Sequence, residues 1–330
     1  MKCRRCGQRA VLDLKSHNTA FCAPCLFAFM ERQVKRAIEQ YQMFGPEDRV
    51  LVCVSGGKDS LTLWDILLRL GYQTAGLYVD LGIQGYSRRS REKVEGFAGQ
   101  RGLEVYVVSL EELGSSVEAL ARRNRRAECA VCGIVKRHFF NRTAVEKGFS
   151  VVATGHNLDD EASRLMGNLL HWQWEYLDRQ APVLPAVGER LARKVQPLCR
   201  VSERETAAYS LLRGIDYILE ECPMSDGATS LRYKQVLNLL EDWMPGVKGN
   251  FYHGFLKHKK SLVNSHKDME KGRGGEIPGA CSLCGFFSHM DPCAFCRLIR
   301  AQERGTQGHK RGASQRKREW RERSQGDGRG

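Results

Sequence analysis

The fold is decided by the stretch Arg49-Val50-Leu51-Val52-Cys53-Val54-Ser55-Gly56-Gly57-Lys58-Asp59-Ser60. Its apolar half predicts a buried strand, and the pattern over 59–70 predicts a helix that begins at the glycines. Backbone N–H groups of such a turn can approach an anion closely, and the helix N-terminus adds its positive dipole end. The spacing differs from a Walker A loop, which has four residues between its first glycine and its Gly-Lys-Ser/Thr. The stretch therefore predicts a nucleotide-phosphate site, with an ordinary strand-to-helix turn as the alternative.

Strand and helix patterns alternate through the middle of the chain. Strand-like runs occur at 50–54, 75–80, 104–108 and 150–154, and helical patterns occur at 59–70, 88–101, 133–147 and 158–170. This alternation predicts an α/β fold with a doubly wound parallel sheet, in which ligands bind at the carboxyl ends of the strands. Asp80 ends the second strand, and Gly155 follows the fourth.

Asp160 lies in the segment Gly155-His156-Asn157-Leu158-Asp159-Asp160-Glu161. Asn157 can cap the following helix, and acidic residues are favourable in a first helical turn, so this segment has a purely structural interpretation. A carboxylate at this edge of the sheet can also hold Mg²⁺ or orient reacting groups. We expect Asp160 to act in this way beside the phosphate loop.

Length and charge restrict the class of protein. The 330 residues suffice for one large or two modest domains, and 42% hydrophobic residues are ordinary for a globular chain. The net charge of +14 indicates a polyanionic partner, most commonly nucleic acid, although merely solvated charges are the alternative. No apolar run approaches the roughly 18 residues of a membrane span, and the N-terminus does not resemble a signal peptide. We therefore expect a cytoplasmic protein without a membrane partner.

Two sets of paired cysteines predict a zinc module at each end of the chain. In a chain without an export signal, 13 cysteines favour metal or redox chemistry over disulfides. The first two pairs are 15 residues apart and the last two are eight apart, as in four-thiolate zinc sites that stabilise small folds. The N-terminal set is Cys3, Cys6, Cys22 and Cys25, and the C-terminal set is Cys281, Cys284, Cys293 and Cys296.

A third cysteine pair, Cys129 and Cys132, lies between the third and fourth strands. A helix that begins near Cys129 places both thiols and the amine of Lys136 on one face. Two buried structural cysteines are the alternative. The residues just before them could hold nucleic acid phosphates; they are Arg122, Arg123, Arg125 and Arg126, called here the arginine cluster. Cys222, directly before a proline, is on its own most simply explained as a core residue.

These features divide the chain into five segments. They are an N-terminal zinc finger (1–27), a catalytic domain (28–220), a helical extension (221–270), a C-terminal zinc ribbon (271–300) and a disordered basic tail (301–330). We expect a helix over about 27–44 to link the first two segments and another helix at 229–241. Residues 297–330 carry 11 Lys and Arg and 4 acidic residues, which suits either nonspecific RNA contact or solubilisation.

Taken together, these residues resemble one family, the tRNA 2-thiolation enzymes of the TtuA type among the PP-loop ATP pyrophosphatases. The resemblance covers about residues 1–300. It rests on the two zinc modules, on the loop of Ser55, Gly56, Gly57, Lys58, Asp59 and Ser60, and on Asp80, Cys129, Cys132, Lys136, Gly155, Asp160 and Cys222. The basic tail after about residue 300 is the one departure from the family pattern.

The resemblance implies a Rossmann-like sheet that binds ATP and Mg²⁺, flanked by modules that hold two Zn²⁺. It further implies that Cys129, Cys132 and Cys222 bind a [4Fe–4S] cluster through three thiolates, with Lys136 and Asp160 as catalytic residues. The implied reaction adenylates the C2 carbonyl oxygen of a tRNA uridine, and sulfur then displaces AMP. The implied partners are tRNA, a ubiquitin-like sulfur carrier with a C-terminal thiocarboxylate, and a second copy in a homodimer. Two alternatives remain, a cytidine 2-thiolating PP-loop enzyme and a non-catalytic zinc-ribbon RNA-binding protein.

Overall fold

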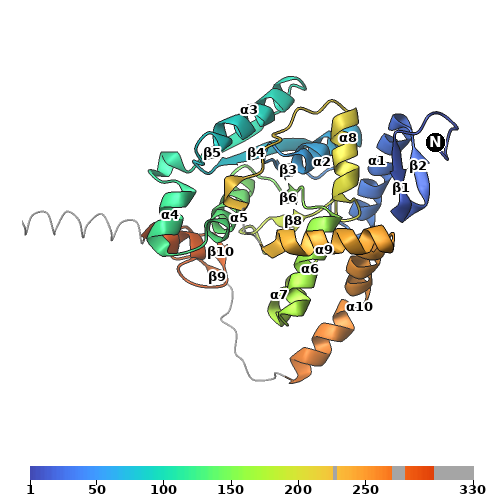
Figure 1. Cartoon of the computed structure of the whole chain (residues 1–330). Helices are drawn as coiled ribbons and strands as arrows, with labels where there is room; N and C mark the ends of the chain where they lie inside the picture. Colours follow the sequence, from blue (N-terminus) through green and yellow to red (C-terminus); the bar gives the residue numbers. More distant parts are fainter. Residues whose placement is uncertain (226–228, 270–278, 301–330) are drawn as a thin grey trace, which may run out of the picture.

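The computed structural model describes residues 1–225, 229–269 and 279–300, arranged around a six-stranded sheet (Figure 1). The order of the strands is β5-β4-β3-β6-β8-β7. Their bounds are β3 Val50–Cys53, β4 Thr74–Asp80, β5 Val105–Ser109, β6 Val151–Thr154, β7 Val183–Leu184 and β8 Arg193–Val195. All neighbouring strands are parallel except β7 and β8, which are antiparallel. The predicted doubly wound parallel sheet is confirmed, and the two unpredicted strands at one end of the sheet, β8 and β7, are too short to leave a periodic pattern.

Each face of the sheet has its own hydrophobic core because alternate residues of a strand point to opposite faces. Val50 and Val52 of β3 belong to the first core, and Leu51 and Cys53 belong to the second. Helices that contribute to the first core are α1 (Ala23–Gln40), α2 (Lys58–Arg69), α3 (Tyr86–Gly99), α6 (Leu158–Leu170) and α8 (Glu203–Leu212). Helices that contribute to the second core are α4 (Val117–Asn124) and α5 (Glu128–Glu146).

Three further helices extend the first core outward. They are α7 (Trp174–Arg179), α9 (Thr229–Trp243) and α10 (Val247–Met269), which contribute buried Leu177, Leu237 and Tyr252. α9 packs along α6, close to the carboxyl ends of the strands (Figure 1). The helix predicted at 229–241 thus corresponds to α9, and α10 follows it after a short turn.

The linking helix predicted over 27–44 is α1, which begins and ends earlier than expected. It begins at Ala23 because Cys22 is its N-cap and a proline occupies its first turn. It ends at Gln40 because Gln42 has a φ of 49°, and the Met43 N–H then returns to Ile38 O at 2.9 Å. The chain therefore leaves the helix before Gly45-Pro46 is reached.

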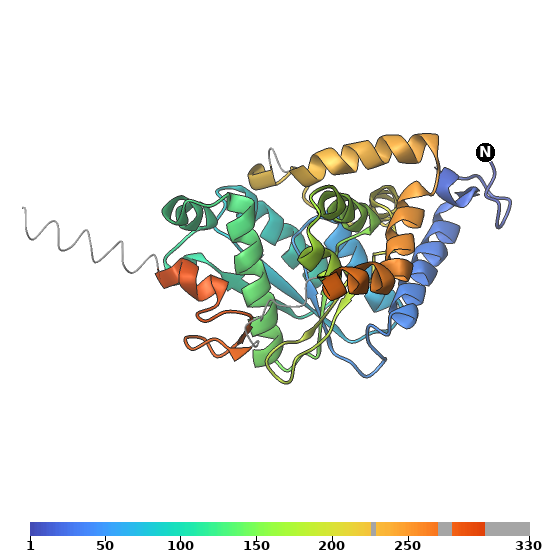
Figure 2. The ribbon, with the colours of Figure 1, turned by 90° about the horizontal axis from the view of Figure 1, so that it is seen from below.

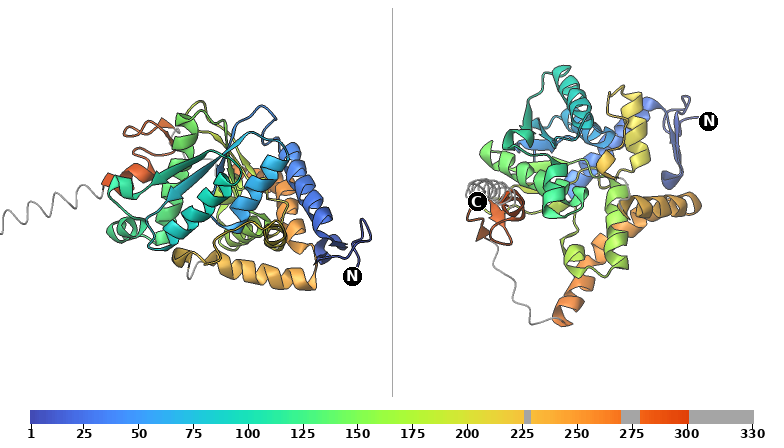
Figure 3. Two further views of the ribbon diagram at one scale, coloured as in Figure 1. Left: turned by 90° about the horizontal axis from the view of Figure 1, so that it is seen from above. Right: turned by 60° about the vertical axis from the view of Figure 1, so that its left-hand side comes forward.

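The two cysteine-rich modules lie at opposite ends of the molecule (Figures 2 and 3). The N-terminal module contains β1 (Leu12–Leu14), the 3₁₀ turn η1 (Lys15–His17) and β2 (Thr19–Phe21), and it packs against α1. The C-terminal module contains β9 (Gly279–Ala280) and β10 (Phe287–Ser288), and its Phe295 stacks on His138 of α5 with ring centroids 3.9 Å apart. Part of the predicted zinc ribbon, 271–278, and the predicted tail, 301–330, lie outside the described residues.

Within the described part of the chain, none of the helices is both long and apolar enough to cross a lipid bilayer.

Candidate active site

The glycine loop connects β3 to α2 at the carboxyl edge of the sheet. The Ser55 N–H donates to Ser60 Oγ at 3.1 Å, and Ser60 Oγ donates to Gly57 O at 3.0 Å. The loop is thus closed on itself by one hydroxyl, and α2 begins at Lys58 with Gly57 as its N-cap. These positions give the loop the form of an anion-binding turn at a helix N-terminus.

Two glycines allow close backbone contacts at this loop. Gly56 has a φ of 76°, and a Cβ there would lie 2.5 Å from Ser90 O of α3. A Cβ on Gly155, after β6, would lie 2.8 Å from Ser60 N. Any larger residue at either position would push the phosphate loop away from its neighbours, so both glycines are required by the packing.

Asp59 is held by side chains from two other segments. Its Oδ1 accepts hydrogen bonds from Asn157 Nδ2 at 3.2 Å and from the hydroxyl of Thr206 on α8. Burial raises the pKa of this carboxyl, and the neighbouring Lys58 ammonium opposes the shift without cancelling it. Asp59 therefore links the phosphate loop to the segment after β6 and to α8.

Beside the loop, Lys58 pairs with Asp59 at 3.1 Å and is also part of a wider network of charged side chains. Lys58 Nζ lies 2.7 Å from Glu203 Oε1, and Lys234 Nζ lies 3.1 Å from Glu203 Oε2 and 2.6 Å from Asp160 Oδ1. Burial alone would raise the pKa of Asp160, but the Lys234 ammonium, with smaller contributions from His156 and the Asn157 N–H, outweighs it and holds that pKa below its usual range. Asp160 is thus kept ionised, as a carboxylate that orients a cation or a reacting group must be.

Asp160 also has a structural role. Asn157 and Asp160 form a reciprocal capping box, in which Asp160 Oδ2 accepts from the Asn157 N–H at 3.0 Å. The other carboxylate oxygen faces Lys234. The structural and functional interpretations of this residue are therefore compatible, because they use different oxygens.

Asp80 ends β4, the strand beside β3 at the same edge of the sheet. Its Oδ1 accepts from the Gly82 N–H at 2.9 Å, which holds the chain in a tight turn after the strand. The residue is half-buried and lies at the same edge of the sheet as the glycine loop.

Cys129, Cys132 and Cys222 lie near one another, although 90 residues separate Cys132 from Cys222. Burial raises the pKa of Cys129, and the other two thiols raise it further, whereas Lys136 opposes this shift. Cys129 Sγ donates to Met224 O at 2.6 Å, in the 3₁₀ turn η3 (Pro223–Ser225) that follows Cys222. The start of α5 and the segment before α9 thus bring three unpaired thiols together at a partly exposed position.

This trio is wider than a site for a single ion. In the described part of the chain, groups whose ligand atoms all lie within 4.8 Å of one another occur only in the two terminal modules. A cubane cluster binds each thiolate through a different iron, so its ligands stand farther apart than those of one ion. Three unpaired thiols that do not form a single-ion site are a donor set that a three-thiolate cluster could use.

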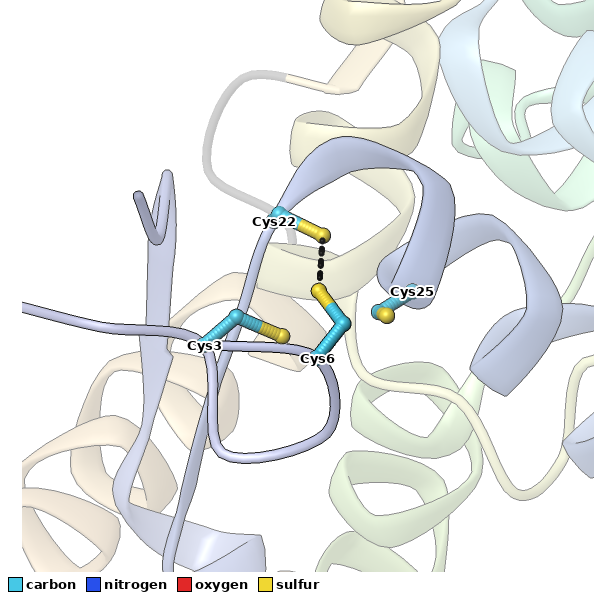
Figure 4. Close-up of side chains that lie close together, drawn as sticks. All are labelled: Cys3, Cys6, Cys22 and Cys25. Carbon is cyan, nitrogen blue, oxygen red and sulfur yellow. Dashed lines mark hydrogen bonds between the residues drawn. The ribbon is translucent and has the colours of Figure 1, made fainter. Parts of the chain in front are cut away.

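The four thiols of the N-terminal module point toward one another (Figure 4). Cys6 Sγ and Cys22 Sγ are 3.4 Å apart, and in the C-terminal module Cys284 Sγ and Cys293 Sγ are 3.8 Å apart. Four thiolates around one tetrahedral zinc ion lie about 3.8 Å from one another, given a Zn–S distance of about 2.3 Å. Both modules therefore have the geometry of a closed four-thiolate site.

The arginine cluster lies at the junction of α4 and α5. Arg122 and Arg123 lie in the last turn of α4, Arg125 is its left-handed C-cap with a φ of 51°, and Arg126 leads into α5. The C-terminal module helps to hold this junction in place, because Asn124 Nδ2 donates to Leu298 O of that module at 3.4 Å. The cluster thus occupies a fixed position at the start of the helix that carries Cys129.

Sequence patterns missed three residues of the site. Glu203, Thr206 and Lys234 contact the predicted residues from α8 and α9, more than 70 positions away along the chain. One signal could have located α8, because Ser202 and Glu205 form a capping box with the spacing Ser-x-x-Glu. No pattern distinguishes Lys234 from the other basic residues.

Comparison with protein families identifies two parts of the chain. Residues 29–226 match the PP-loop domain family, and residues 2–27 match the N-terminal LIM domain of the 2-thiouridine synthetase TtuA.

Curated relatives match along most of the chain. The tRNA-5-methyluridine(54) 2-sulfurtransferase of Thermus thermophilus is 48% identical, over 90% of this chain and 91% of that protein. The protein of the same name from Pyrococcus horikoshii is 41% identical, over 90% and 93%. Cytoplasmic tRNA 2-thiolation protein 1 of Drosophila willistoni is 30% identical, over 91% and 88%.

Among solved structures, the U34-tRNA thiolase NcsA of Methanococcus maripaludis, determined with its [4Fe–4S] cluster, superposes with a TM-score of 0.75. The superposition covers 91% of this chain and 96% of the NcsA chain at 24% sequence identity, which establishes a shared fold.

Proposed function

The chain belongs to the PP-loop family and groups there with the TtuA-type 2-sulfurtransferases, and on that premise we propose that it is an ATP-dependent tRNA 2-thiolation enzyme. The observation that carries the proposal is the convergence of two chemically different groups at one edge of the sheet. One group is the phosphate loop with Asp59 and Asp160, and the other is the trio of Cys129, Cys132 and Cys222. Lys136 interacts electrostatically with Cys129 and with His156, beside Asp160, and so is close to both groups.

The first half of the reaction would use the phosphate loop. Ser55 to Ser60 would hold the phosphates of ATP, with Asp80 toward the nucleoside and Gly155 allowing close contact. The C2 carbonyl oxygen of a uridine would attack the α-phosphorus, which forms a C–O–P bond and releases pyrophosphate. Asp160, kept ionised by Lys234, would hold Mg²⁺ or orient the uridine.

The second half would use the cysteine trio. A [4Fe–4S] cluster bound by Cys129, Cys132 and Cys222 would have one iron without a protein ligand, free to hold sulfide. Sulfur from a thiocarboxylated carrier of ubiquitin-like fold would replace oxygen at C2, and AMP would leave. Lys136 would stabilise negative charge near the thiols and beside the departing phosphate.

The remaining assignments follow the same proposal. Each terminal module would hold one Zn²⁺ as a structural ion, and the arginine cluster would bind tRNA phosphates beside Cys129. The protein would be a cytoplasmic homodimer. Each chain would consist of a zinc finger (1–27), a catalytic domain (28–220), a helical extension (221–270) and a zinc ribbon (271–300). The sequence identity of this chain to the tRNA-5-methyluridine(54) 2-sulfurtransferases is higher than its identity to cytoplasmic tRNA 2-thiolation protein 1. This difference favours position 54 of the tRNA as the target.

The test is an anaerobic assay with reconstituted protein, ATP, sulfide and tRNA that carries 5-methyluridine at position 54 but no thiolated base. We expect AMP and pyrophosphate in equal amounts with 2-thiouridine, located by mass spectrometry of nuclease digests. Thiolated cytidine would instead support the cytidine-modifying alternative. Binding of tRNA without AMP formation by cluster-loaded protein would support the non-catalytic alternative.

A further inference from the structure

A cavity leads outward from Asp160, between α6 and the first turns of α9. Its volume is about 640 Å³, and its lining includes His156, Asp160, Arg164, His171, Tyr233 and Lys234. His171 Nε2 and Tyr233 OH, 3.1 Å apart, join the two walls. The cavity therefore begins at the proposed catalytic carboxylate and ends where α6 gives way to α7.

An exposed tryptophan stands at this outer end. Trp172 is 68% exposed, and its neighbours His171 and Gln173 both line the cavity. Its ring lies 5.8 Å from that of Trp174, and Tyr176 of α7 is also exposed. These side chains form an aromatic rim next to the cavity.

The backbone below the rim is fixed, so the exposure of Trp172 does not come from a loose loop. Trp172 has a φ of 51°, and the Gln173 N–H returns to Asn168 O at 2.9 Å. The buried Asn168 Nδ2 donates to Gln180 Oε1 at 2.9 Å, and Gln180 Nε2 donates to Glu161 O at 2.8 Å. A left-handed backbone and a buried amide pair thus hold the indole ring in a position where most of it faces solvent.

The charge beside the rim is positive. Arg164 is exposed on α6 and pairs with Glu161 Oε1 at 3.1 Å. Arg137 is exposed on α5 and has no carboxylate partner in the part of the chain that the structure describes. Arg137 interacts electrostatically with Arg164, Cys132 and Tyr176, so it is close to both the cysteine trio and the aromatic rim. Of the described residues that line the cavity, one is acidic, Asp160, and Lys234 already neutralises it.

We propose that this surface binds the unpaired tRNA nucleotides next to the target uridine, with a base stacked on Trp172 and a backbone phosphate held by Arg137 and Arg164. An aromatic face combined with exposed arginines is the usual means of holding single-stranded RNA. A protein partner would need an apolar surface of larger extent, and this patch is small, positively charged and continuous with the site of the chemistry. The inference rests on the proposed function, because it requires tRNA as the substrate.

The test compares Trp172→Ala with two controls in the anaerobically reconstituted full chain. Trp172→Phe retains an aromatic face, and Trp243→Ala removes an equally exposed tryptophan, 74% accessible, at the far end of α9. We expect Trp172→Ala to raise the Kd for unmodified tRNA by about 10-fold to 100-fold, as for loss of one stacked base. Each control should change it by about threefold or less.

The salt dependence separates stacking from phosphate contact. Trp172→Ala should leave the slope of log Kd against log salt unchanged, whereas Arg137→Gln should reduce it by about 1. Equal urea midpoints for all variants would establish that folding is intact. A Kd for Trp172→Ala no higher than that for Trp243→Ala would overturn the inference. Unchanged tRNA binding by Trp172→Ala, together with a change in its molar mass by light scattering, would also overturn it, because the surface would then be a contact between protein chains. If the wild-type protein thiolates tRNA and Trp172→Ala binds and thiolates equally well, this inference alone fails; if the wild-type protein does neither, the proposed function fails as well.

Discussion

Replacing Lys234 by Met should destabilise the protein by about 2 to 3 kcal/mol. Its ammonium lies 2.6 Å from Asp160 Oδ1 and 3.1 Å from Glu203 Oε2, and the side chains of Lys234 and Asp160 are 19% and 27% exposed. Removing one partner of a fully buried ion pair costs about 3 to 5 kcal/mol, whereas surface pairs contribute about 1 kcal/mol or less. Partial exposure places this pair between the two limits. Glu203 keeps Lys58 as a partner, so the loss falls mainly on Asp160.

Lys93→Met is the matched control. Lys93 Nζ also lies 2.6 Å from a carboxylate, Asp216 Oδ1, but these side chains are 32% and 74% exposed. We expect this variant to lose about 1 kcal/mol or less in urea unfolding. Equal losses for the two variants would refute the argument that burial, rather than distance, sets the strength of the Lys234 pair.

The pH dependence tests the same reasoning through the charge of Asp160. In the wild type its folded pKa is depressed, so its stabilising contribution is present above the unfolded pKa and is lost as the pH falls through the folded pKa. In Lys234→Met, burial is no longer opposed by the ammonium, so the pKa of Asp160 should rise above its unfolded value. The variant then gains stability relative to the wild type on acidification, and the difference should shrink between about pH 7.5 and about pH 4.5. A difference that stays constant or grows over this range would show that Asp160 is not the group concerned.

Three further predictions concern the loop, the cluster and the arginines. Gly56→Ala should destabilise the protein by about 2 kcal/mol or more and abolish ATP binding in a titration, because the new Cβ would lie 2.5 Å from Ser90 O. The control is Gly71→Ala, where φ is 83° but no atom lies within 4 Å of the new Cβ; this variant should lose about 1 kcal/mol of stability and keep ATP binding. Cys222→Ala should lose iron on anaerobic reconstitution but keep about two zinc ions per chain by elemental analysis, and unchanged iron would exclude it as a ligand. Replacing the arginine cluster by glutamine should slow single-turnover thiolation at saturating tRNA without weakening ATP binding, since the substrate would bind out of register; an unaffected rate would place the tRNA elsewhere.

Residues that act within one short segment could be predicted from the sequence. The phosphate loop, the capping residue Asn157 and the paired cysteines each carry their geometry in their spacing, because a turn or a helix start fixes where neighbouring residues lie. Four of the five parallel strands could also be predicted, since long buried strands give continuous apolar runs such as Val50–Cys53, whereas the fifth, β8, has only three residues.

Residues that reach the site from distant helices could not be predicted in this way. Lys234 is one of 52 lysines and arginines, and its neighbours on α9 include both buried and exposed positions without a strong pattern. Only the packing of α9 along α6 brings its ammonium to Asp160. The same holds for Thr206, whose hydroxyl meets Asp59 because α8 packs against α2. Such contacts depend on tertiary structure, which local sequence does not encode.

The segment after β6 shows how a local rule and a tertiary contact combine. Asn157 Oδ1 accepts from the Asp160 N–H at 3.1 Å, as its capping role predicts, and this leaves its Nδ2 group to donate to Asp59 Oδ1 at 3.2 Å. The returning bond from the Asn157 N–H occupies one oxygen of Asp160, so the other oxygen has a single orientation, toward Lys234. One helix cap therefore fixes the position of the phosphate loop relative to the ionised carboxylate of Asp160. Because both groups depend on the same amide, a shift of the loop on nucleotide binding would move the carboxylate with it, which is what a site that must align ATP with a second substrate requires.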